Sequence, residues 1–415
     1  MKLTFRLREY GTLALVFLLP WQARWIARFG ASEWSTLSVF ATEAFLAALL
    51  LLVIFERDFL RRLKEVLPRR AVIFGVLLIV WSYLSIIWSE APDLSLQKAA
   101  MLSLVLGAIV IFFGFRHSDR LIGIFIFSMV LNSAFGFWQV FNGAFDASTW
   151  LGIASQSASG ASSVVESGAG RLLRAYGTLP HPNIFGGFLA LAVLLWVACF
   201  FKSKKSRVRI IILFSLSIII LALFLTFSRS AWIAAVVALI PILFALRKKV
   251  FANSMILSVI IPFIVAAIFL WPFALGRVSG QGRLETRSTI ERVSSWKNGF
   301  ASFAAHPILG LGSGMVAAGQ GAFKTDQREP AHFLPLQAAV ELGIPGLILL
   351  SALWWLILIE AKSDFFSCGI FAALTVLGVF DHYLWTTWAG NLLLAFSIFL
   401  IFRHKNAVFA GNDGS

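Results

Sequence analysis

The sequence contains little charge and very little cysteine. Charged side chains make up 13% of the 415 residues, whereas soluble domains carry roughly 25%, so most classes of soluble protein are excluded. The two cysteines, Cys199 and Cys368, both lie inside apolar runs. Their position argues against a disulfide framework.

Apolar residues are correspondingly abundant. They make up 59% of the chain, and their runs are long enough to cross a bilayer as helices of about 20 residues. We therefore predict an all-α, polytopic membrane protein that forms a single integral membrane domain over residues 1–415, with about twelve membrane-spanning helices. The expected spans are 10–29, 35–55, 71–88, 98–115, 121–141, 183–201, 210–227, 230–246, 252–273, 333–358, 365–381 and 389–403.

The net charge of +15 is mainly a signal of orientation. With the N-terminus in the cytoplasm, alternation of the loops assigns 22 of the 35 Lys and Arg residues to the cytoplasmic side, as the positive-inside rule requires. We predict that both termini are cytoplasmic, that the first run is a retained helix rather than a signal peptide, and that no nucleic acid is bound.

Two of the predicted outer connections are long, at residues 142–182 and 274–332. The first becomes basic at Arg171 and Arg174, and the second carries Arg287 and other arginines. Of the thirteen outer cations ten are arginine, whose planar fork suits phosphate and carboxylate groups. We interpret both segments as periplasmic loops and expect the second to carry part of an active site. The alternative is that these arginines pair with outer acidic residues or lipid headgroups.

Arg229 and His332 each lie at a predicted helix junction. Arg229 occupies a tight link between two apolar runs, where the amides of a helix N-terminus help to hold phosphate; the alternative is an arginine that snorkels to the membrane edge. His332 lies where the second long loop enters a helix. Imidazole is the usual general base, although a polar side chain at a helix start is the simpler explanation.

Three further segments offer candidate binding residues. His181 and Asn183 precede a predicted span, where Asn183 is expected to cap the helix or to bind a sugar or phosphate. The glycines of residues 306–314, among them Gly312, allow a ligand to approach the backbone closely. Trp296 could stack on a sugar ring, although tryptophan at span ends more often belongs to an interfacial belt.

A metal or other cofactor is not expected. The chain has no H-E-x-x-H motif and no Cys/His cluster, and its predicted outer segments have no Asp-x-Asp pair. Zinc needs three or four ligands at short spacing, and magnesium is held through carboxylates.

Four sequence pieces together resemble the O-antigen ligase and O-antigen polymerase superfamily of bacterial envelope glycosyltransferases. They occur in the family's order, and the last resembles the ligase motif of a histidine ten residues ahead of a glycine. The segment Asp381–Tyr383 before the final span is similar as well. The four pieces are Gly177–Asn183 with Gly186 and Gly187, Phe227–Trp232, Arg292 with Trp296 followed by His306–Gly312, and His332 followed by Gly343.

The resemblance implies transfer of an undecaprenyl diphosphate-linked glycan at the outer face of the bacterial inner membrane, without a metal. Arg229 and Arg292 would then hold the diphosphate, and His332 would act as the base. The ligase pattern usually has leucine where this chain has Trp296, so Arg283 and Arg287 remain alternatives to Arg292. The acceptor implied for a ligase is a sugar hydroxyl of lipid A-core.

Two other functions stay open at this point. A polymerase of the same superfamily would use a second lipid-linked glycan as acceptor, and the motif at His332 favours the ligase only slightly. A lipid-linked glycan flippase would show two related halves and polar residues spread along its spans, which this sequence does not.

Overall fold

Long apolar helices build most of the molecule. The computed structural model describes residues 2–54, 56–115, 117–160, 163–168, 170–246, 252–279, 283–316 and 329–403. The helices are α1 (Lys2–Phe17), α2 (Ala41–Ile54), α3 (Arg57–Val66), α4 (Arg69–Leu84), α5 (Pro92–Gly114), α6 (Ser118–Asn142), α7 (Pro182–Lys202), α8 (Ser206–Leu225), α9 (Arg229–Leu246), α10 (Ala252–Phe269), α11 (Trp271–Ser279), α12 (Arg283–Ala305), α13 (Leu334–Ala361), α14 (Phe365–Phe380), α15 (Tyr383–Thr386) and α16 (Trp388–Arg403). The strands are β1 (Arg24–Arg28), β2 (Leu37–Phe40), β3 (Ala144–Phe145), β4 (Gln156–Ser157), β5 (Val164–Ser167) and β6 (Gly170–Leu173).

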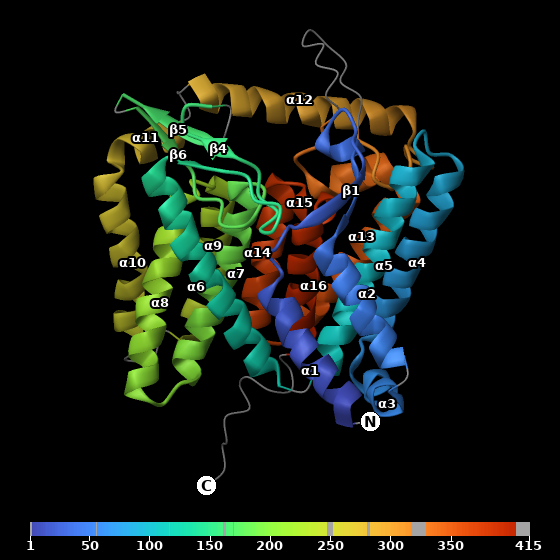
Figure 1. The fold of residues 1–415 in the computed structure, drawn as a ribbon, viewed down its shortest axis with the longest axis horizontal. Helices are drawn as coiled ribbons and strands as arrows, with labels where there is room; N and C mark the ends of the chain where they lie inside the picture. The colour runs from blue at the N-terminus through green and yellow to red at the C-terminus, as the bar shows by residue number, and fades with distance from the viewer. Residues whose placement is uncertain are drawn as a thin grey trace.

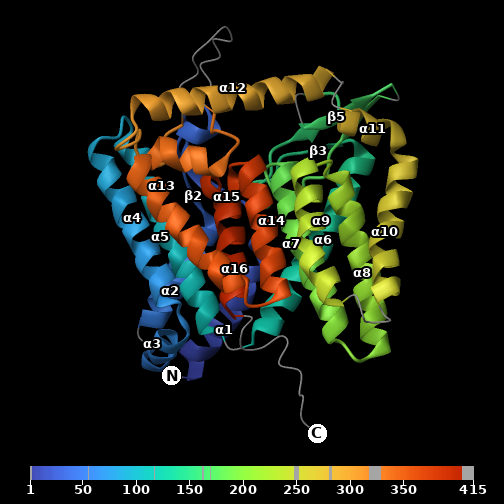
Figure 2. The same ribbon diagram turned by 180° about the vertical axis from the view of Figure 1, so that it is seen from behind.

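Most helices run side by side in one bundle, and α12 lies across one end of it (Figure 1). The view from behind shows the same arrangement, with α3 and the start of α1 at the opposite end (Figure 2). We call these the α12 end and the α3 end. The strands, which form three small antiparallel pairs, lie toward the α12 end.

Six helices of the described residues are long and apolar enough to span a membrane: α4 with its 3-10 extension to Ile87, α5, α6, α7, α8 and α13. Shorter apolar helices, among them α2, α9, α14 and α16, pack alongside them. The outer faces carry large exposed apolar side chains such as Ile211, Phe214 and Val236, which suit contact with lipid rather than water. The molecule is thus a helical membrane protein, and the number twelve stays a prediction.

Helix α7 is the most central element of the bundle. Its side chains are buried on all sides, including Phe185, Phe188 and Leu189, which is the pattern of a helix with no exposed face. Phe188 stacks on Phe125 of α6 with ring centroids 6.2 Å apart. The start of α7 is therefore held firmly by its neighbours, and that start carries site residues.

The first two predicted spans are wrong in their bounds. Helix α1 ends at Phe17 instead of residue 29, because Pro20 disfavours helical backbone at the residue before it. Residues 24–28 then form strand β1, which pairs with β2 before α2 begins at Ala41. The chain between the two helices is thus a hairpin, so the all-α prediction is correct only for the bundle.

The prediction of two long loops also needs correction. Residues 142–182 contain strands β3 to β6, and residues 274–332 contain the 23-residue helix α12. The search for apolar runs did not predict helix α12, because the composition of this helix is polar. Its buried positions Ser295 and Gly299, with the half-buried Arg292 and Phe303, recur at helical spacing and form one narrow inner face.

Helix α13 is broken at Gly343, and the segment after α12 fills the break. Gly343 has φ 62° and ψ −163°, and residue 345 is proline, which has no N–H for the carbonyl of Glu341. The amide of Gly312 donates to that carbonyl instead, at 2.9 Å, and the amide of Ile344 donates to Pro307 at 2.8 Å. The break thus joins the family-like segments 306–314 and 332–343.

We predict that Gly343→Ala destabilises the protein. A Cβ at this position would lie 2.2 Å from the carbonyl oxygen of Ile308, and left-handed backbone at a residue other than glycine costs about 1–3 kcal/mol before any clash. Gly75→Ala in α4 is the control, because a Cβ there meets nothing within 4 Å. The check is the midpoint of thermal unfolding in detergent, and equal midpoints for both variants would contradict the role of Gly343.

Candidate active site

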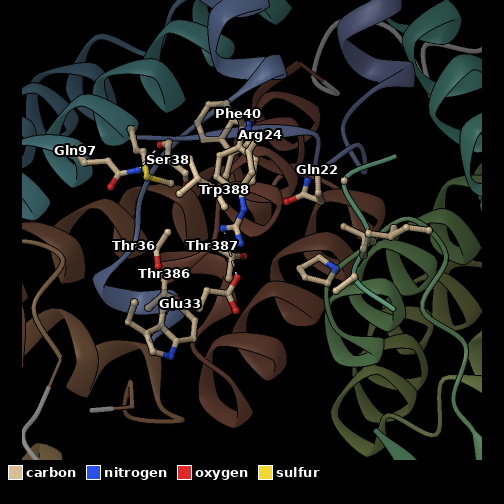
Figure 3. A pocket seen from close by; sticks show the side chains of 18 of the residues that line it. Gln22, Arg24, Glu33, Thr36, Ser38, Phe40, Gln97, Thr386, Thr387 and Trp388 are labelled. Carbon is tan, nitrogen blue, oxygen red and sulfur yellow. Dashed lines mark hydrogen bonds and ion pairs between the residues drawn. The ribbon is translucent and has the colours of Figure 1, made fainter. Parts of the chain in front are cut away.

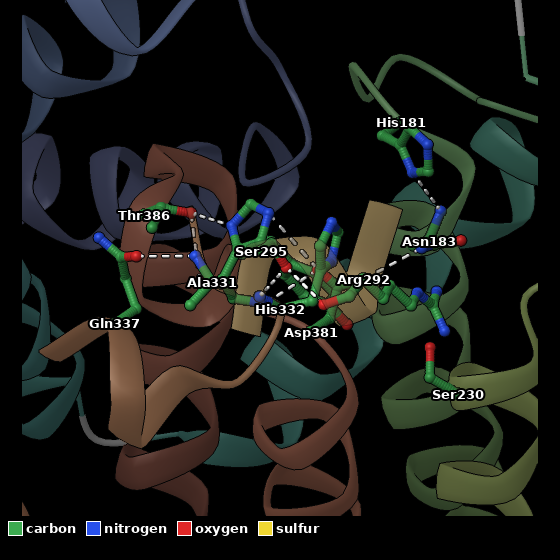
Figure 4. Close-up of polar contacts among 12 residues, drawn as sticks. His181, Asn183, Ser230, Arg292, Ser295, Ala331, His332, Gln337, Asp381 and Thr386 are labelled. Atoms are coloured by element: carbon green, nitrogen blue, oxygen red, sulfur yellow. Dashed lines mark hydrogen bonds and ion pairs between the residues drawn. The ribbon is translucent and has the colours of Figure 1, made fainter. Parts of the chain in front are cut away.

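Several segments from distant parts of the sequence meet at the α12 end, between α12 and the bundle. They are the chain before α7, the turn between α8 and α9, α12 itself, the chain before α13, and the link between α14 and α15. Figure 4 shows their polar side chains pointing toward one another, with His332 and Asp381 at the centre.

His332 and Asp381 form the central pair. Nδ1 of His332 lies 3.5 Å from Oδ1 of Asp381, which is an ion-pair distance rather than that of a short hydrogen bond. This nitrogen is buried, whereas the side chain as a whole is 24% exposed. Because Nδ1 faces the carboxylate, Nε2 is the nitrogen left to take up a proton from a ligand.

The carboxylate of Asp381 is ionised. Burial by itself raises its pKa, but the approach of the His332 ring and the neighbouring imidazoles outweigh burial and hold the pKa well below its ordinary value. Oδ1 also accepts the backbone N–H of His382 at 2.9 Å. A carboxylate that stays charged can fix the ring orientation of His332 and stabilise its protonated form.

Asn183 and Arg174 extend this pair across the bundle. The amide nitrogen of Asn183 donates to Oδ2 of Asp381 at 3.0 Å, and its oxygen accepts a hydrogen bond from Arg174 at 2.7 Å. Arg174 is buried and also donates to the carbonyl of Thr226 at 2.6 Å. One chain of contacts therefore links the ends of α8, α7 and α14 to His332.

The capping residue of α7 is His181, not Asn183 as predicted. Nδ1 of His181 accepts the backbone N–H of Asn183 at 3.1 Å, so its other nitrogen carries the proton and lies 3.1 Å from Oγ of Ser163. Burial, followed by the positive charge of Arg174, lowers the pKa of His181 to about 3. Asn183 is thereby free to use its side chain on Asp381 and Arg174.

His382 packs on the ring of His332, with centroids 4.8 Å apart. Burial lowers the pKa of His382 to about 3, and the charge of Arg292 contributes to the lowering while Asp381 opposes it. His382 is therefore neutral near pH 7. Its Nδ1 lies 2.6 Å from the hydroxyl oxygen of Thr386.

Helix α12 holds Arg292 and Ser295 over this cluster. Oγ of Ser295 accepts the backbone N–H of His332 at 3.4 Å and donates to the carbonyl of Arg292 at 2.9 Å. Arg292 is close enough to His382 to influence its pKa. The structure thus brings Arg292 near the central pair, and its role toward a diphosphate stays a prediction.

Arg229 begins α9 directly after a strained turn. Phe227 has a φ of 46° and is fully buried, and left-handed backbone at a bulky residue is a strain that tends to occur at functional sites. The same turn supplies the Thr226 carbonyl that holds Arg174. Arg229 is half-buried and lies three residues from that contact.

The remaining predicted binding residues lie around the cluster. Arg171 pairs with Glu166 at 3.2 Å, and Arg287 pairs with Glu291 at 2.8 Å, so both form the ion pairs that were the alternative expectation. Trp296 is 40% exposed on α12. Gly312 has a φ of 107° and lies against Ser89, where it packs beside the broken helix. Their roles toward a ligand stay predictions.

Sequence reasoning did not assign Asp381, His382 or Ser295 to the site. The Asp-His pair at the end of an apolar run was the available signal, since an acidic residue at that position needs a partner. No sequence signal pointed to Ser295, because its role depends on the inner face of α12, a helix that could not be predicted from its polar composition.

Three of these side chains could hold a metal ion. The ligand atoms of His332, Asp381 and His382 lie within 4.8 Å of one another, and two imidazoles with one carboxylate are a donor set that zinc accepts. The absence of a metal is therefore an expectation from the sequence that needs a chelator test.

We predict that the His181 cap makes the protein less stable at low pH. Its pKa falls from 6.5 in the unfolded chain to about 3 in the folded one, so the unfolded chain binds the proton first. The stability is fully present above about pH 6.5 and is lost as the pH falls toward 3. His181→Asn keeps a capping oxygen that does not titrate. Its thermal unfolding midpoint should therefore fall less than that of the wild type between pH 7.5 and 4.5.

The control for this prediction is His117→Asn. His117 also stands at the N-cap of a helix, α6, but makes no side-chain capping bond there. The same pH-dependent loss in the wild type and in both variants would contradict the role of His181.

Comparison with known proteins agrees with the residues at the site. The family described as O-antigen ligase matches residues 214–351, which include Arg229, Arg292 and His332. An "O-antigen polymerase" of Salmonella muenchen is 26% identical over 182 residues, which are 43% of this chain and 45% of that protein. The chain thus matches less than half the length of this relative.

Among solved structures, a chain of a peptidoglycan synthase complex superposes with a TM-score of 0.42 at 13% identity, covering 81% of this chain and 98% of that one. A TM-score below 0.5 does not establish a common fold. The family match and the curated relative together confirm the resemblance seen in the sequence motifs. Residues 214–351 of the chain are thus similar to the O-antigen ligase family, and part of the chain is similar to an O-antigen polymerase.

Proposed function

We propose that this membrane enzyme of the O-antigen ligase and polymerase type is a ligase. It transfers a glycan from undecaprenyl diphosphate to a sugar hydroxyl of lipid A-core, without a metal and with inversion at the anomeric carbon. The family match supports the ligase. The observation that carries the transfer chemistry is the buried, ionised Asp381 against Nδ1 of His332, because this pairing prepares the other ring nitrogen to act as a base.

The proposed reaction is a single displacement. The acceptor hydroxyl oxygen forms a bond to the anomeric carbon while the bond from that carbon to the diphosphate oxygen breaks. The hydroxyl proton passes to Nε2 of His332, and the electron pair of the broken bond leaves on undecaprenyl diphosphate. His332 then returns its proton to water, so no covalent glycan–enzyme intermediate is required.

Arginines neutralise the leaving group in this proposal. Diphosphate departs readily, so the main demand on the protein is to stabilise the charge that grows on its oxygens. Arg229 at the start of α9 and Arg292 on the inner face of α12 meet that demand from two elements, and an arginine fork can bind two phosphate oxygens at once. Arg174 is already held by Thr226 and Asn183, so we assign it to positioning Asn183.

We propose that the α12 end faces the periplasm and that the protein lies in the bacterial inner membrane. The basic helix α3 lies at the opposite end with the start of α1 (Figure 1), which agrees with cytoplasmic basic loops under the positive-inside rule. Donor and acceptor would then both reach the site from the outer leaflet.

The polymerase is the alternative with direct support, because the curated relative carries that name. It differs from the ligase only in the acceptor, a second lipid-linked glycan. A flippase would not need a base, and the ordered pair of His332 and Asp381 makes it the weaker proposal.

The deciding experiment is reconstitution of the full-length protein in proteoliposomes with an undecaprenyl diphosphate-linked glycan. Lipid A-core and a second lipid-linked glycan are offered separately, with and without EDTA. We expect extension of lipid A-core that EDTA leaves unchanged. Extension of the lipid-linked glycan alone would establish the polymerase, and transfer to neither acceptor would favour the flippase.

We predict that His332→Ala lowers the rate of transfer by about 10²–10⁴-fold, the usual contribution of a general base. Asp381→Asn should lower it at least tenfold and shift the pH profile, because the ring loses its charged partner while the side chain keeps its size. Initial rates in the reconstituted assay give both values, and normal unfolding midpoints exclude misfolding.

His117→Ala is the matched control for these two variants. His117 directly precedes α6, is exposed and makes no side-chain capping bond there, so its loss should change the rate less than twofold. Full activity in His332→Ala would remove that residue from the role of base.

A further inference from the structure

A cavity of about 540 Å³ opens beside the proposed catalytic pair. Its walls come from the hairpin of β1 and β2, the first turns of α5, the segment from β3 to β4, and the junction of α15 with α16. Figure 3 shows Arg24, Glu33 and Gln97 together with Thr386 and Trp388 around it. The hairpin and the β3–β4 segment lie outside residues 214–351, where the family match is found.

The cavity lies near the proposed catalytic histidine and is separated from it by His382. Thr386 lines it and lies 2.6 Å from Nδ1 of His382, and the ring of Trp34, also in the wall, packs edge-on against His382 at 5.3 Å. His382 in turn contacts the ring of His332. A single imidazole, that of His382, therefore stands between the wall of the cavity and the ring of His332.

None of the residues that line the cavity belongs to α9. In Figure 4, Thr386, which lines the cavity, lies on one side of His332, whereas Ser230 at the start of α9 lies on the other. In a single displacement the attacking hydroxyl and the leaving group occupy opposite sides of the reacting carbon. If the diphosphate binds beside Arg229, the cavity is on the side of the acceptor.

The chemistry of the walls fits a sugar chain. Trp34, Phe40 and Tyr176 offer aromatic faces, and amide and hydroxyl groups from Gln22, Gln97 and Thr36 offer donors and acceptors among them. A mostly apolar wall with a few placed polar groups is the usual character of a binding pocket, and 540 Å³ lies within its usual range of about 300–1,000 Å³.

The charges of the cavity argue against the other substrates of the reaction. Arg24 stands 3.8 Å from Glu33, and Lys98 faces Glu341 and donates to the carbonyl of Trp385. Because each cation in the wall has an acid near it, a diphosphate would meet repulsion along with attraction. A polyprenyl tail would have to bury these polar groups without partners, which is costly.

We propose that this cavity is the subsite for the acceptor glycan and that the hairpin of β1 and β2 sets acceptor specificity through Arg24 and Glu33. The proposal rests on the proposed function, since it assigns one of the two substrates of that reaction to a place. Both side chains are partly exposed, 31% for Arg24 and 53% for Glu33, and a long, exposed ion pair holds its members only weakly. Each can therefore turn to bind hydroxyl groups of a sugar.

The test compares Arg24→Ala and Glu33→Gln with the wild type in the reconstituted full-length protein. We expect the KM for the acceptor to rise at least tenfold in each variant, with kcat and the KM for the lipid-linked donor within twofold of the wild type. Arg28→Ala is the matched control: Arg28 belongs to the same hairpin and pairs with Asp93, but it does not line the cavity. Its acceptor KM should stay within twofold.

A rise in the donor KM instead, or an equal effect of Arg28→Ala, would overturn the assignment of the cavity to the acceptor. A second measurement does not depend on turnover: lipid-free core oligosaccharide and lipid-free O-antigen repeat are titrated against intrinsic tryptophan fluorescence, because Trp34 and Trp388 line the cavity. Binding that Arg24→Ala weakens at least tenfold supports the subsite even if wild-type transfer fails. Binding of neither sugar, or binding that Arg24→Ala leaves unchanged, refutes the subsite even if transfer succeeds.

Discussion

The contact between the buried carboxylate of Asp381 and the ring of His332 is the interaction on which the site depends. A carboxylate that is out of water is stable only when several groups hold it, and here Asn183, the amide of His382 and the imidazole of His332 do so. These partners come from α7, α13 and the link after α14. The need to satisfy one charge therefore fixes the relative position of three elements that are far apart in the sequence.

The broken helix α13 supplies the second constraint. Proline at 345 and glycine at 343 leave carbonyls of the helix without their ordinary partners, and the segment from Pro307 to Gly312 supplies the missing hydrogen bonds. The same segment is the continuation of α12, which carries Arg292 and Ser295. The break in α13 thus fixes the end of α12 next to the site. Ser295 of α12 then accepts a hydrogen bond from the backbone N–H of His332. These backbone hydrogen bonds explain why a glycine-rich stretch accompanies the histidine.

The sequence predicted the membrane class, the helical bundle and the location of His332 at a helix start, because long apolar runs and abrupt junctions are local features. It did not predict α12, since a helix that lies across the bundle end needs only a narrow apolar face and may be polar elsewhere. The sequence also did not predict that His181, rather than Asn183, caps α7. Asparagine is the commoner cap, but the buried Asp381 in the link after α14 competes for its side chain, and only the tertiary structure places that aspartate there.

The distribution of the site over the chain has a consequence for substrate choice. Arg229, Arg292 and His332, to which we assign the diphosphate and the proton, all lie in the matched segment 214–351. Asp381 and Asn183, which hold the ring of His332, and most of the cavity beside it lie outside that segment, whereas Ser295, which holds its backbone, lies inside it. In the reaction that we propose, a ligase and a polymerase would use the same kind of donor and differ in the acceptor. An enzyme that changes its acceptor must keep the groups that stabilise the leaving group and may alter the walls on the other side of the base. The hairpin of β1 and β2 offers positions for such change at Arg24 and Glu33, whose side chains are partly exposed, whereas Trp34 between its strands packs on His382 and links the hairpin to the site.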